Sequence, residues 1–372
     1  MDLKVAIVHD YLNQYGGAER VLVEVHSIFP KAPIYTLIYD RKKMPRRFAE
    51  WDIRTSFLQK MPLVRRHYEK YFLLMPMAVE QFDLSDYNLV LSLSSAWAKG
   101  VLTSMNVCHI CYCHNPMRFA WEDFYNRLQR EKNPIYKLGL RFFLHNIRIW
   151  DTVNSNRVDY FIANSTRVKN RIRKYYGKEA EVIPPPCKCD FFYPEDNVRD
   201  DGFYLTVSRL RPYKRIDLAI RAFNRLDQPL VIIGDGDERG RLEAMANENI
   251  KFLGRLSDTQ IRNYYQRCKA FIFPCLEDFG IAPIEAQSCG KPVIAYSKGG
   301  IRESVIDGET GVLFYLQTEQ ALIDAVLKFE QKKFNPQNIR QNALRFSEQR
   351  FRERLLSFVH KCANEYFGVM DA

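Results

Sequence analysis

The sequence lacks long hydrophobic stretches, since no apolar run reaches the 18 residues that suggest a membrane span. Its first segment, MDLKVAIVHD, leads directly into a strand-like pattern instead of the regions of a secretory signal. We therefore expect neither a transmembrane helix nor a Sec-type signal peptide, and we expect a cytoplasmic location. The chain has 372 residues, 47% of them hydrophobic, which excludes wholesale disorder and allows two domains with their own cores.

Cysteine chemistry also finds little support. Nine cysteines, an odd number without an export signal, argue against a disulfide framework. Cys108, Cys111 and Cys113 precede His114, but no second CxxC or HxxxH pair completes a tetrahedral metal site. The surrounding VCHICYCHN is typical of a buried strand. Residues 235–237 (DGD) follow a strand pattern and are expected to form a turn, so we predict no metal and no other cofactor.

Positive charge is concentrated in one half of the chain. Residues 1–190 hold 29 Lys and Arg against 19 Asp and Glu, whereas residues 191–372 hold 26 against 25. A one-sided cationic field predicts an anionic partner such as phosphate, nucleic acid or an acidic membrane surface. The alternative is a surface that only promotes solubility.

Strand and helix patterns alternate along both halves, with several continuous apolar strands of the kind found in parallel sheets covered on both faces. The fold class predicted is therefore α/β, with two doubly wound Rossmann-like domains. The predicted strands are Leu3–Val8, Ile34–Ile38, Leu89–Leu93, Val107–Cys113, Asp159–Ala163, Glu181–Ile183, Phe203–Val207, Leu230–Ile233, Lys251–Leu253, Ala270–Phe273, Pro292–Ala295 and Val312–Phe314.

The domain boundary is predicted after residue 190. Pro184-Pro185-Pro186 and the polar segment Glu195 to Asp201 are typical of a linker between sheets. We expect an N-terminal, acceptor-side domain over 1–190 and a donor domain over 191–349. The end of the chain has helical periodicity without a following strand, and residues 350–372 are expected to rejoin the first domain.

Two basic stretches of the first half have helical spacing. In each, the pattern fits either an amphipathic helix on an anionic membrane or a core-packed helix with a solvated cationic face. We favour the membrane for the pair, with Arg65, Arg66, Lys70, Lys137 and Arg141 as contacts. The apolar residues assigned to the two helices are Val64, Tyr68, Tyr71, Phe72 and Met75, and Tyr136, Leu140, Phe143, Ile147 and Trp150; His145 and Arg148 extend the second cationic face.

Two loops combine a helix start with glycine or with cations. Gly16-Gly17 opens a helix after the first strand, where backbone amides are available to an anion, although such a turn is often structural. The nicotinamide fingerprint GxGxxG is absent there. Arg209 and Lys214 follow the first strand of the second half, where they could clamp a diphosphate or remain solvated.

The sharpest signal is EDFGIAPIEA, residues 277–286. Pro283 fits the first turn of a helix, which would expose the amides of Phe279, Gly280 and Ile281 to a phosphate. Glu277 and Glu285 bracket that turn and suit hydroxyl-rich ligands such as sugars and ribose. The alternative is that the two carboxylates only complement the helix dipole and the surface.

Taken together, GGAER, SRLRPYKR, IIGDGDE, IKFLGRLSD, FPCLEDFGIAPIEAQSCGKPVIAY and GGIRESVIDGETGVLF resemble glycosyltransferase family 4 over nearly the whole chain. The resemblance implies the GT-B fold, two facing Rossmann-like domains with a cleft between them. SSAWAKGV, CYCHNPMRFAWE and ANSTRVKNRI are similar to the bacterial polysaccharide branch, mannosyltransferases in particular.

The resemblance also implies roles for residues. Arg209 and Lys214 match the diphosphate contacts. Glu277 and Glu285 match the E-x7-E pair, whose first member contacts the sugar and whose second holds the ribose. The further donor contacts it implies are the amides of Phe279, Gly280 and Ile281, the glycine loop Gly16 and Gly17, the segment from Phe252 to Arg255 beside the base, mostly through backbone, and a histidine near the sugar, assigned to His114 with His109 as the alternative.

The expected function is retaining transfer of a hexose, with GDP-mannose as donor and a lipid-linked or polysaccharide acceptor at the inner face of the cytoplasmic membrane. Arg209, Lys214, Glu277 and His114 are the expected catalytic residues. A sugar-nucleotide 2-epimerase of the same fold, or a non-catalytic basic protein that binds lipid or nucleic acid, are the alternatives. Nucleic acid is not the expected partner, because the ligand loops lie in the nearly neutral half.

Overall fold

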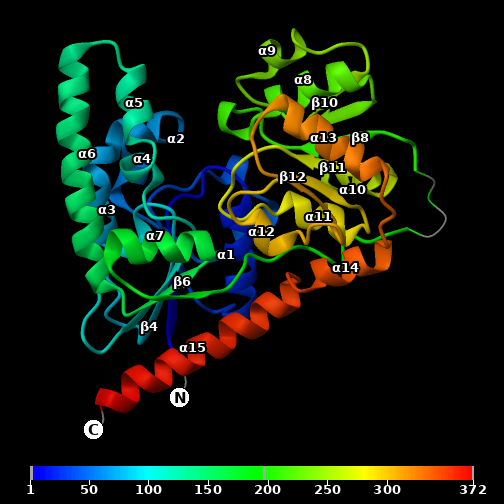
Figure 1. The fold of residues 1–372 in the computed structure, drawn as a ribbon. Coiled ribbons are helices and arrows are strands. Elements are labelled where there is room, and N and C mark those ends of the chain that lie inside the picture. The colour runs from blue at the N-terminus through cyan, green and yellow to red at the C-terminus, as the bar shows by residue number, and fades with distance from the viewer. Residues whose placement is uncertain (1–2, 196–197, 199, 371–372) are drawn as a thin grey trace. The chain divides into compact units, whose positions relative to one another are not determined.

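The computed structural model describes residues 3–195, 198 and 200–370, which form two compact units (Figure 1). The first unit comprises the chain up to Pro184 and again from Phe351 onward, and the second comprises Pro185–Arg350. The chain thus divides a few residues before the predicted boundary. Of the predicted linker Glu195 to Asp201, residues 196, 197 and 199 lie outside the described residues.

The first unit is built on a parallel sheet of seven strands in the order β3-β2-β1-β4-β5-β6-β7. Side chains of β1, β4 and β5 are buried along their whole length, because helices cover both faces. The strands are β1 (Val5–His9), β2 (Ile34–Thr36), β3 (Ile53–Thr55), β4 (Leu89–Ser94), β5 (Cys108–Cys113), β6 (Tyr160–Ala163) and β7 (Ala180–Val182).

The second unit repeats this plan with a parallel sheet of six strands in the order β10-β9-β8-β11-β12-β13. Separate buried clusters lie on its two faces. The strands are β8 (Tyr204–Val207), β9 (Leu230–Ile233), β10 (Ile250–Gly254), β11 (Ala270–Phe273), β12 (Val293–Tyr296) and β13 (Gly311–Phe314). The prediction of two parallel α/β sheets is confirmed, and each predicted strand is present; β3 was not predicted.

Helices begin where polar caps or proline satisfy or remove the first backbone donors. Ser165 caps α7 and Ser257 caps α10, while Asn133 followed by proline starts α6. The α-helices are α1 (Gly17–Ile28), α2 (Val64–His67), α3 (Met75–Glu80), α4 (Arg118–Trp121), α5 (Phe124–Arg130), α6 (Pro134–Asn154), α7 (Thr166–Tyr176), α8 (Ile216–Leu226), α9 (Arg239–Glu243), α10 (Asp258–Arg267), α11 (Ala282–Ser288), α12 (Ile301–Ser304), α13 (Glu319–Glu330), α14 (Pro336–Leu344) and α15 (Glu348–Met370).

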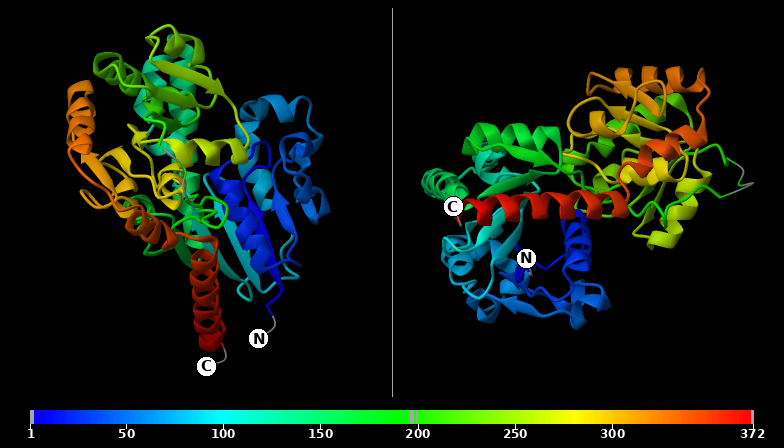
Figure 2. Two further views of the ribbon diagram at one scale, coloured as in Figure 1. Left: turned by 90° about the vertical axis from the view of Figure 1, so that its right-hand side faces the viewer. Right: turned by 90° about the horizontal axis from the view of Figure 1, so that it is seen from below.

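The long C-terminal helix α15 packs on the first unit (Figure 2). Phe351, Leu355 and Val359 are buried at helical spacing in the same cluster as the strands of that unit. Arg352 Nη1 pairs with Glu24 Oε2 of α1 at 2.5 Å, which ties α15 to the beginning of the chain.

A charged network lies inside the first unit. Lys99 and Asp151 are fully buried, and Lys99 Nζ lies 2.6 Å from Asp151 Oδ1. The other carboxylate oxygen accepts from Trp121 Nε1 at 2.7 Å and from the Tyr176 hydroxyl at 2.9 Å. Because every partner is supplied by the protein, the buried charges are compensated.

Within the described part of the chain, none of the helices combines the length and the apolar character needed to cross a bilayer.

Candidate functional site

The candidate site lies at the carboxyl edge of the second sheet, where the strand order reverses. From β8 the chain proceeds to β9 and β10 on one side and to β11, β12 and β13 on the other. Ligands of open α/β sheets bind at such a switch point. Because β8 and β11 are neighbours, the loops that follow them, residues 208–215 and 274–281, leave the sheet side by side.

Lys214 and Glu277 meet in this place. Lys214 ends a short 3-10 turn, Pro212–Lys214, and Glu277 lies on the loop after β11. Their side chains form an ion pair and are 15% and 22% exposed, so the pair is shielded but reachable. Arg209 is exposed on the Lys214 loop. The structure therefore brings together the cation and the carboxylate that the sequence singled out most strongly.

The turn into α11 has the predicted form. Pro283 occupies the first turn of the helix, and Phe279 is buried against Phe346 with ring centroids 5.5 Å apart. Gly280 has φ +91°, and a Cβ at that position would lie 3.0 Å from Phe273 Cζ. Glycine is therefore required here, and Phe279, Gly280 and Ile281 enter the helix through a fixed turn.

A second glycine pair supports this loop. Gly300 N donates to Glu277 O at 3.1 Å, and Gly299 pairs with Glu277 as an isolated bridge. A Cβ on Gly299 would lie 2.1 Å from Glu277 O, and one on Gly300 would lie 2.2 Å from Asp278 O. The two glycines let the backbones approach closely and so position Glu277. Their role was not predicted, although two consecutive glycines after a predicted strand are the signal for it.

Glu285 is held from behind by a tyrosine that was not predicted. Glu285 is 5% exposed on α11, and the hydroxyl of the fully buried Tyr265 donates to its Oε2 at 3.1 Å. Burial, and then the charge of Glu285, raise the pKa of Tyr265 well above its ordinary value. Tyr265 thus remains a hydrogen-bond donor, and it fixes one carboxylate oxygen of Glu285.

Phe252 and Arg255 have side chains engaged elsewhere. Phe252 lies within β10 and packs against the core of the second unit. Arg255 Nε lies 3.7 Å from Asp235 Oδ2. Their backbone borders the carboxyl end of β10, which agrees with the expectation of a contact made mostly through main chain.

In the first unit, Gly16 and Gly17 begin α1 after β1. Glu19, buried in the first turn, accepts from Gly16 N at 2.6 Å and lies 3.5 Å from Nε2 of the buried His9. This arrangement fixes the backbone of the glycine pair at the carboxyl edge of the first sheet.

His114 and His109 have different surroundings. His109 is fully buried inside β5, with its Nε2 2.8 Å from Ser92 Oγ and its Nδ1 3.1 Å from Arg157 O. His114 directly follows β5 at the carboxyl edge, and its enclosed Nε2 has no hydrogen-bond partner among the described residues. Burial, and then the charge of His9, lower the pKa of His114 to about 3, so the ring is neutral at neutral pH. Of the two, His114 is the one placed to meet a ligand.

Asp10 occupies the switch point of the first sheet, between β1 and β4. Its buried carboxylate accepts four backbone N–H bonds at 2.6 to 2.9 Å, from Ser95, Ala96, Trp97 and Ala98. One side chain thereby anchors the whole loop that follows β4.

The first basic stretch differs from the prediction of one amphipathic helix. It forms α2, a 3-10 segment Tyr68–Leu74, and α3, because Leu63 has φ +54° and Pro76 starts a new helix. Its apolar residues do face the core, and Arg65, Arg66 and Lys70 are exposed.

The second basic stretch is a single helix, α6, but the prediction of its faces was partly wrong. Leu140, Phe143, Ile147 and Trp150 pack on the core, whereas Tyr136 is exposed. Arg141 is exposed and Lys137 is half-buried. Arg148 is not part of a solvated face, since it lies over the Phe124 ring and donates to Ala120 O at 3.1 Å.

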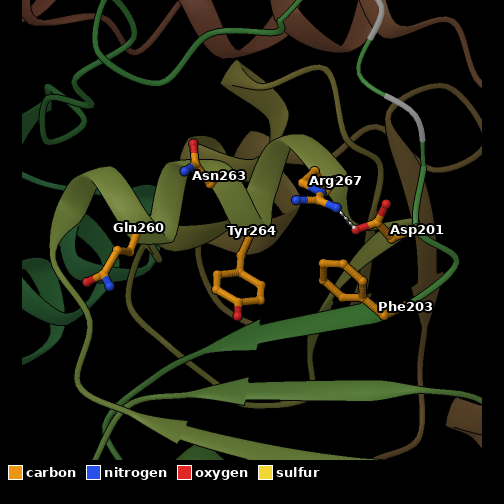
Figure 3. Close-up of a pocket in the computed structure, with 6 residues that line it drawn as sticks. All are labelled: Asp201, Phe203, Gln260, Asn263, Tyr264 and Arg267. Atoms are coloured by element: carbon orange, nitrogen blue, oxygen red, sulfur yellow. Dashed lines mark ion pairs between the residues drawn. The ribbon is translucent and has the colours of Figure 1, made fainter.

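A cavity of about 350 Å³ lies at the opposite, amino edge of the second sheet (Figure 3). Phe203, just before β8, and residues of α10 form it, and Arg267 Nη2 pairs with Asp201 Oδ2 at 2.6 Å. Its lining residues are Asp201, Phe203, Gln260, Asn263, Tyr264 and Arg267. It contains none of the predicted site residues.

The nine cysteines are buried thiols. In the portion of the chain that the structure describes, no group of three or more His, Cys, Asp or Glu side chains is arranged to hold a metal ion.

Comparison with known proteins identifies the class. The family described as Glycosyltransferase Family 4 matches residues 15–191, and the family described as Glycosyl transferases group 1 matches residues 192–346. A HepE protein of Anabaena, solved with UDP and glucose, covers 96% of this chain and 99% of its own at 17% identity and a TM-score of 0.73. Sucrose-phosphate synthase of Thermosynechococcus elongatus covers 96% and 98% at 19% identity and a TM-score of 0.76. The fold is that of the GT-B glycosyltransferases.

Sequence relatives narrow the class. An uncharacterized glycosyltransferase of Methanocaldococcus jannaschii is 29% identical over 58% of this chain and 61% of its own length. A GDP-mannose-dependent alpha-(1-6)-phosphatidylinositol monomannoside mannosyltransferase of Mycolicibacterium smegmatis is 30% identical over 43% of this chain and 49% of its own. The chain spans about half the length of the curated relatives it matches. It belongs to the family 4 type of glycosyltransferases.

Proposed function

We propose that this protein is a retaining hexosyltransferase that moves mannose from GDP-mannose onto a lipid-linked or polysaccharide acceptor in the synthesis of a cell-surface glycan. The observation that carries the proposal is the Lys214–Glu277 pair at the switch point of the second sheet, next to the turn that enters α11. A cation for the diphosphate and a carboxylate for sugar hydroxyls are there side by side.

The proposed chemistry follows from where charge develops. Breaking the glycosyl–phosphate bond places negative charge on the departing diphosphate and positive charge on the anomeric carbon. Lys214, Arg209 and the amides of residues 279–281 stabilise the first, and the Glu277 carboxylate binds hydroxyls of the sugar. We propose retention by a front-face route, in which the leaving phosphate helps to deprotonate the acceptor.

The remaining donor contacts are proposed in the same way. Glu285 binds the ribose, and the backbone between Phe252 and Arg255 borders the base. Gly16 and Gly17 of the first unit bind the donor through main chain, and His114 meets the sugar as a neutral ring, which can donate or accept one hydrogen bond at each nitrogen. The reaction as proposed needs no metal or other cofactor, so EDTA should leave the rate unchanged.

The donor and the location are supported by a relative and by surface charge. GDP-mannose is named for the M. smegmatis relative, and the lipid acceptor follows that same name. A peripheral position on the inner face of the cytoplasmic membrane is supported by the exposed Arg65, Arg66, Lys70 and Arg141.

A panel of nucleotide-sugars tests the donor. We expect GDP-mannose to raise the melting temperature, because a ligand at 100 times its Kd adds about 2.7 kcal/mol, and UDP-glucose to have no effect. Stabilisation by uridine donors alone would overturn the choice of base. Formation of an epimer from the donor alone would indicate a 2-epimerase, and salt-sensitive binding of nucleic acid without use of any donor would indicate a non-catalytic protein.

Tyr265→Phe tests the ribose contact. Removing the hydroxyl frees Glu285 Oε2, and a hydrogen bond to a charged group contributes about 1.5–3 kcal/mol, so the Kd of GDP should rise about tenfold. A guanosine diphosphate without ribose hydroxyls should bind the variant and the parent protein alike. Tyr264→Phe, on the same helix, is the matched control. Equal weakening for both nucleotides would show that Tyr265 acts on overall packing.

A further inference from the structure

Helix α6 carries two separate apolar rows. One faces the core of the first unit, where Leu144 and Ile147 are buried. The other faces solvent. Ile135, Leu138, Phe142, Ile149 and Val153 are 80%, 68%, 73%, 50% and 56% exposed.

The exposed row has the spacing of a single helix face. Successive members are three, four, seven and four residues apart, which places all five side chains within one stripe along the helix. With 21 residues, α6 is about 30 Å long, so the stripe extends over most of that length. Figure 1 shows α6 along the outer side of its unit. Contiguous exposed apolar side chains of this size mark an interaction surface.

Positive charge borders the stripe. Arg141 is exposed one turn from Leu138, and Arg130 and Lys132 are exposed just before the helix begins. Acidic side chains are scarce here, since Asp151 is the only Asp or Glu among residues 134–154 and it is buried against Lys99. An apolar stripe with a cationic border fits the boundary between the acyl chains and the headgroups of an anionic bilayer.

A second copy of the chain fits this surface less well. In a two-fold helix pair formed through the stripe, the middle of α6 would face its own copy. Arg141 would then approach the equivalent cation of the other copy across the axis, and like charges in an interface are unfavourable. An anionic lipid surface instead pairs with these cations.

We propose that the exposed row of α6 inserts into the surface of an anionic phospholipid bilayer, with Phe142 and Leu138 near its centre and Arg141 at the headgroups. The inference deepens the proposed function, on which it rests for a membrane-bound acceptor. It differs from the expectation drawn from the sequence, because the inserted side chains are those of the solvent-facing row and not the apolar residues that turn out to pack on the core.

Vesicle sedimentation of the full chain tests the proposal. We expect binding to vesicles of phosphatidylglycerol and phosphatidylcholine, and weak binding to phosphatidylcholine alone. The double variant Leu138→Gln/Phe142→Gln should lower the partition coefficient at least about tenfold, because both side chains lose apolar contact with the bilayer. Leu316→Gln/Leu327→Gln, which removes two exposed apolar side chains of the second unit, is the matched control and should bind as the parent protein does.

Two further measurements keep the test sharp. Phe142→Trp should show a blue shift of its added emission with anionic vesicles, and the absence of a shift would overturn insertion. Unchanged vesicle binding by the Leu138/Phe142 variant would also overturn it. A parent protein that is dimeric, and that this variant converts to a monomer, would assign the stripe to self-association. None of these outcomes alters stabilisation by GDP-mannose, which tests the proposed function separately.

Discussion

Lys214→Ala is expected to lower kcat/KM for sugar transfer by a hundredfold or more. The ammonium faces Glu277 at the switch point of the second sheet and, in the proposed reaction, balances the charge of the departing diphosphate. Removing one such preorganised group typically costs on the order of 3 kcal/mol of transition-state stabilisation. The loss should be larger still because Glu277 would then repel the phosphates without a compensating cation. Initial rates with donor and acceptor varied separately measure the effect.

Arg211→Ala is the matched control for this experiment. Arg211 lies on the same loop, is exposed, and forms an ion pair with Asp237 instead of Glu277. Its removal should change kcat/KM by no more than about twofold, since exposed ion pairs contribute little. If Lys214→Ala retained the parent rate, or if both variants lost activity equally, Lys214 would have no specific role in transfer.

Asp151→Asn is expected to have the largest effect on stability. The substitution keeps the size of the side chain but leaves the fully buried Lys99 ammonium without an opposite charge. Breaking a buried pair in this way costs about 3–5 kcal/mol. Thermal unfolding should show a melting temperature roughly 10 °C lower, since about 1 kcal/mol corresponds to 2–4 °C for a unit of this size.

Lys99→Met combined with Asp151→Asn separates charge from packing. The double variant no longer buries a charge, and the amide oxygen introduced at position 151 can still accept from Trp121 and Tyr176. It should therefore be more stable than Asp151→Asn alone. A double variant that is as unstable as the sum of the two single variants would show that the pair is not coupled.

The fold was largely predictable because parallel strands buried on both faces leave continuous apolar runs, as in AFIF of β11 and VIAY of β12. β3 was missed because it has three residues, none of them buried, inside a basic segment. The expected helix over residues 64–75 was wrong in detail. Periodicity correctly identified its buried side chains, but the left-handed Leu63 and Pro76 divide the segment into short helices.

The candidate site was predictable where chemistry and spacing coincide on one loop. Glu277 and Glu285 bracket a helix start, and their loop lies beside that of Lys214 because β8 and β11 are neighbours. Tyr265 left no comparable signal, since a tyrosine in an amphipathic helix usually packs in a core. Only the structure shows that its hydroxyl reaches Glu285. The outer row of α6 was missed for a related reason, because α6 has two apolar faces and periodicity does not show which of them is covered.

Asp10 has a consequence for how the two sheets divide their ligands. Four amides that converge after β4 would form a ready receptor for a phosphate, but the carboxylate of Asp10 already fills it. An incoming anion would have to displace a negative group that the protein supplies itself. The loop after β4 is thus closed to anions, and the neutral His114 beside it suits uncharged hydroxyls. At the corresponding edge of the other sheet, Lys214 leaves phosphate recognition to the second unit.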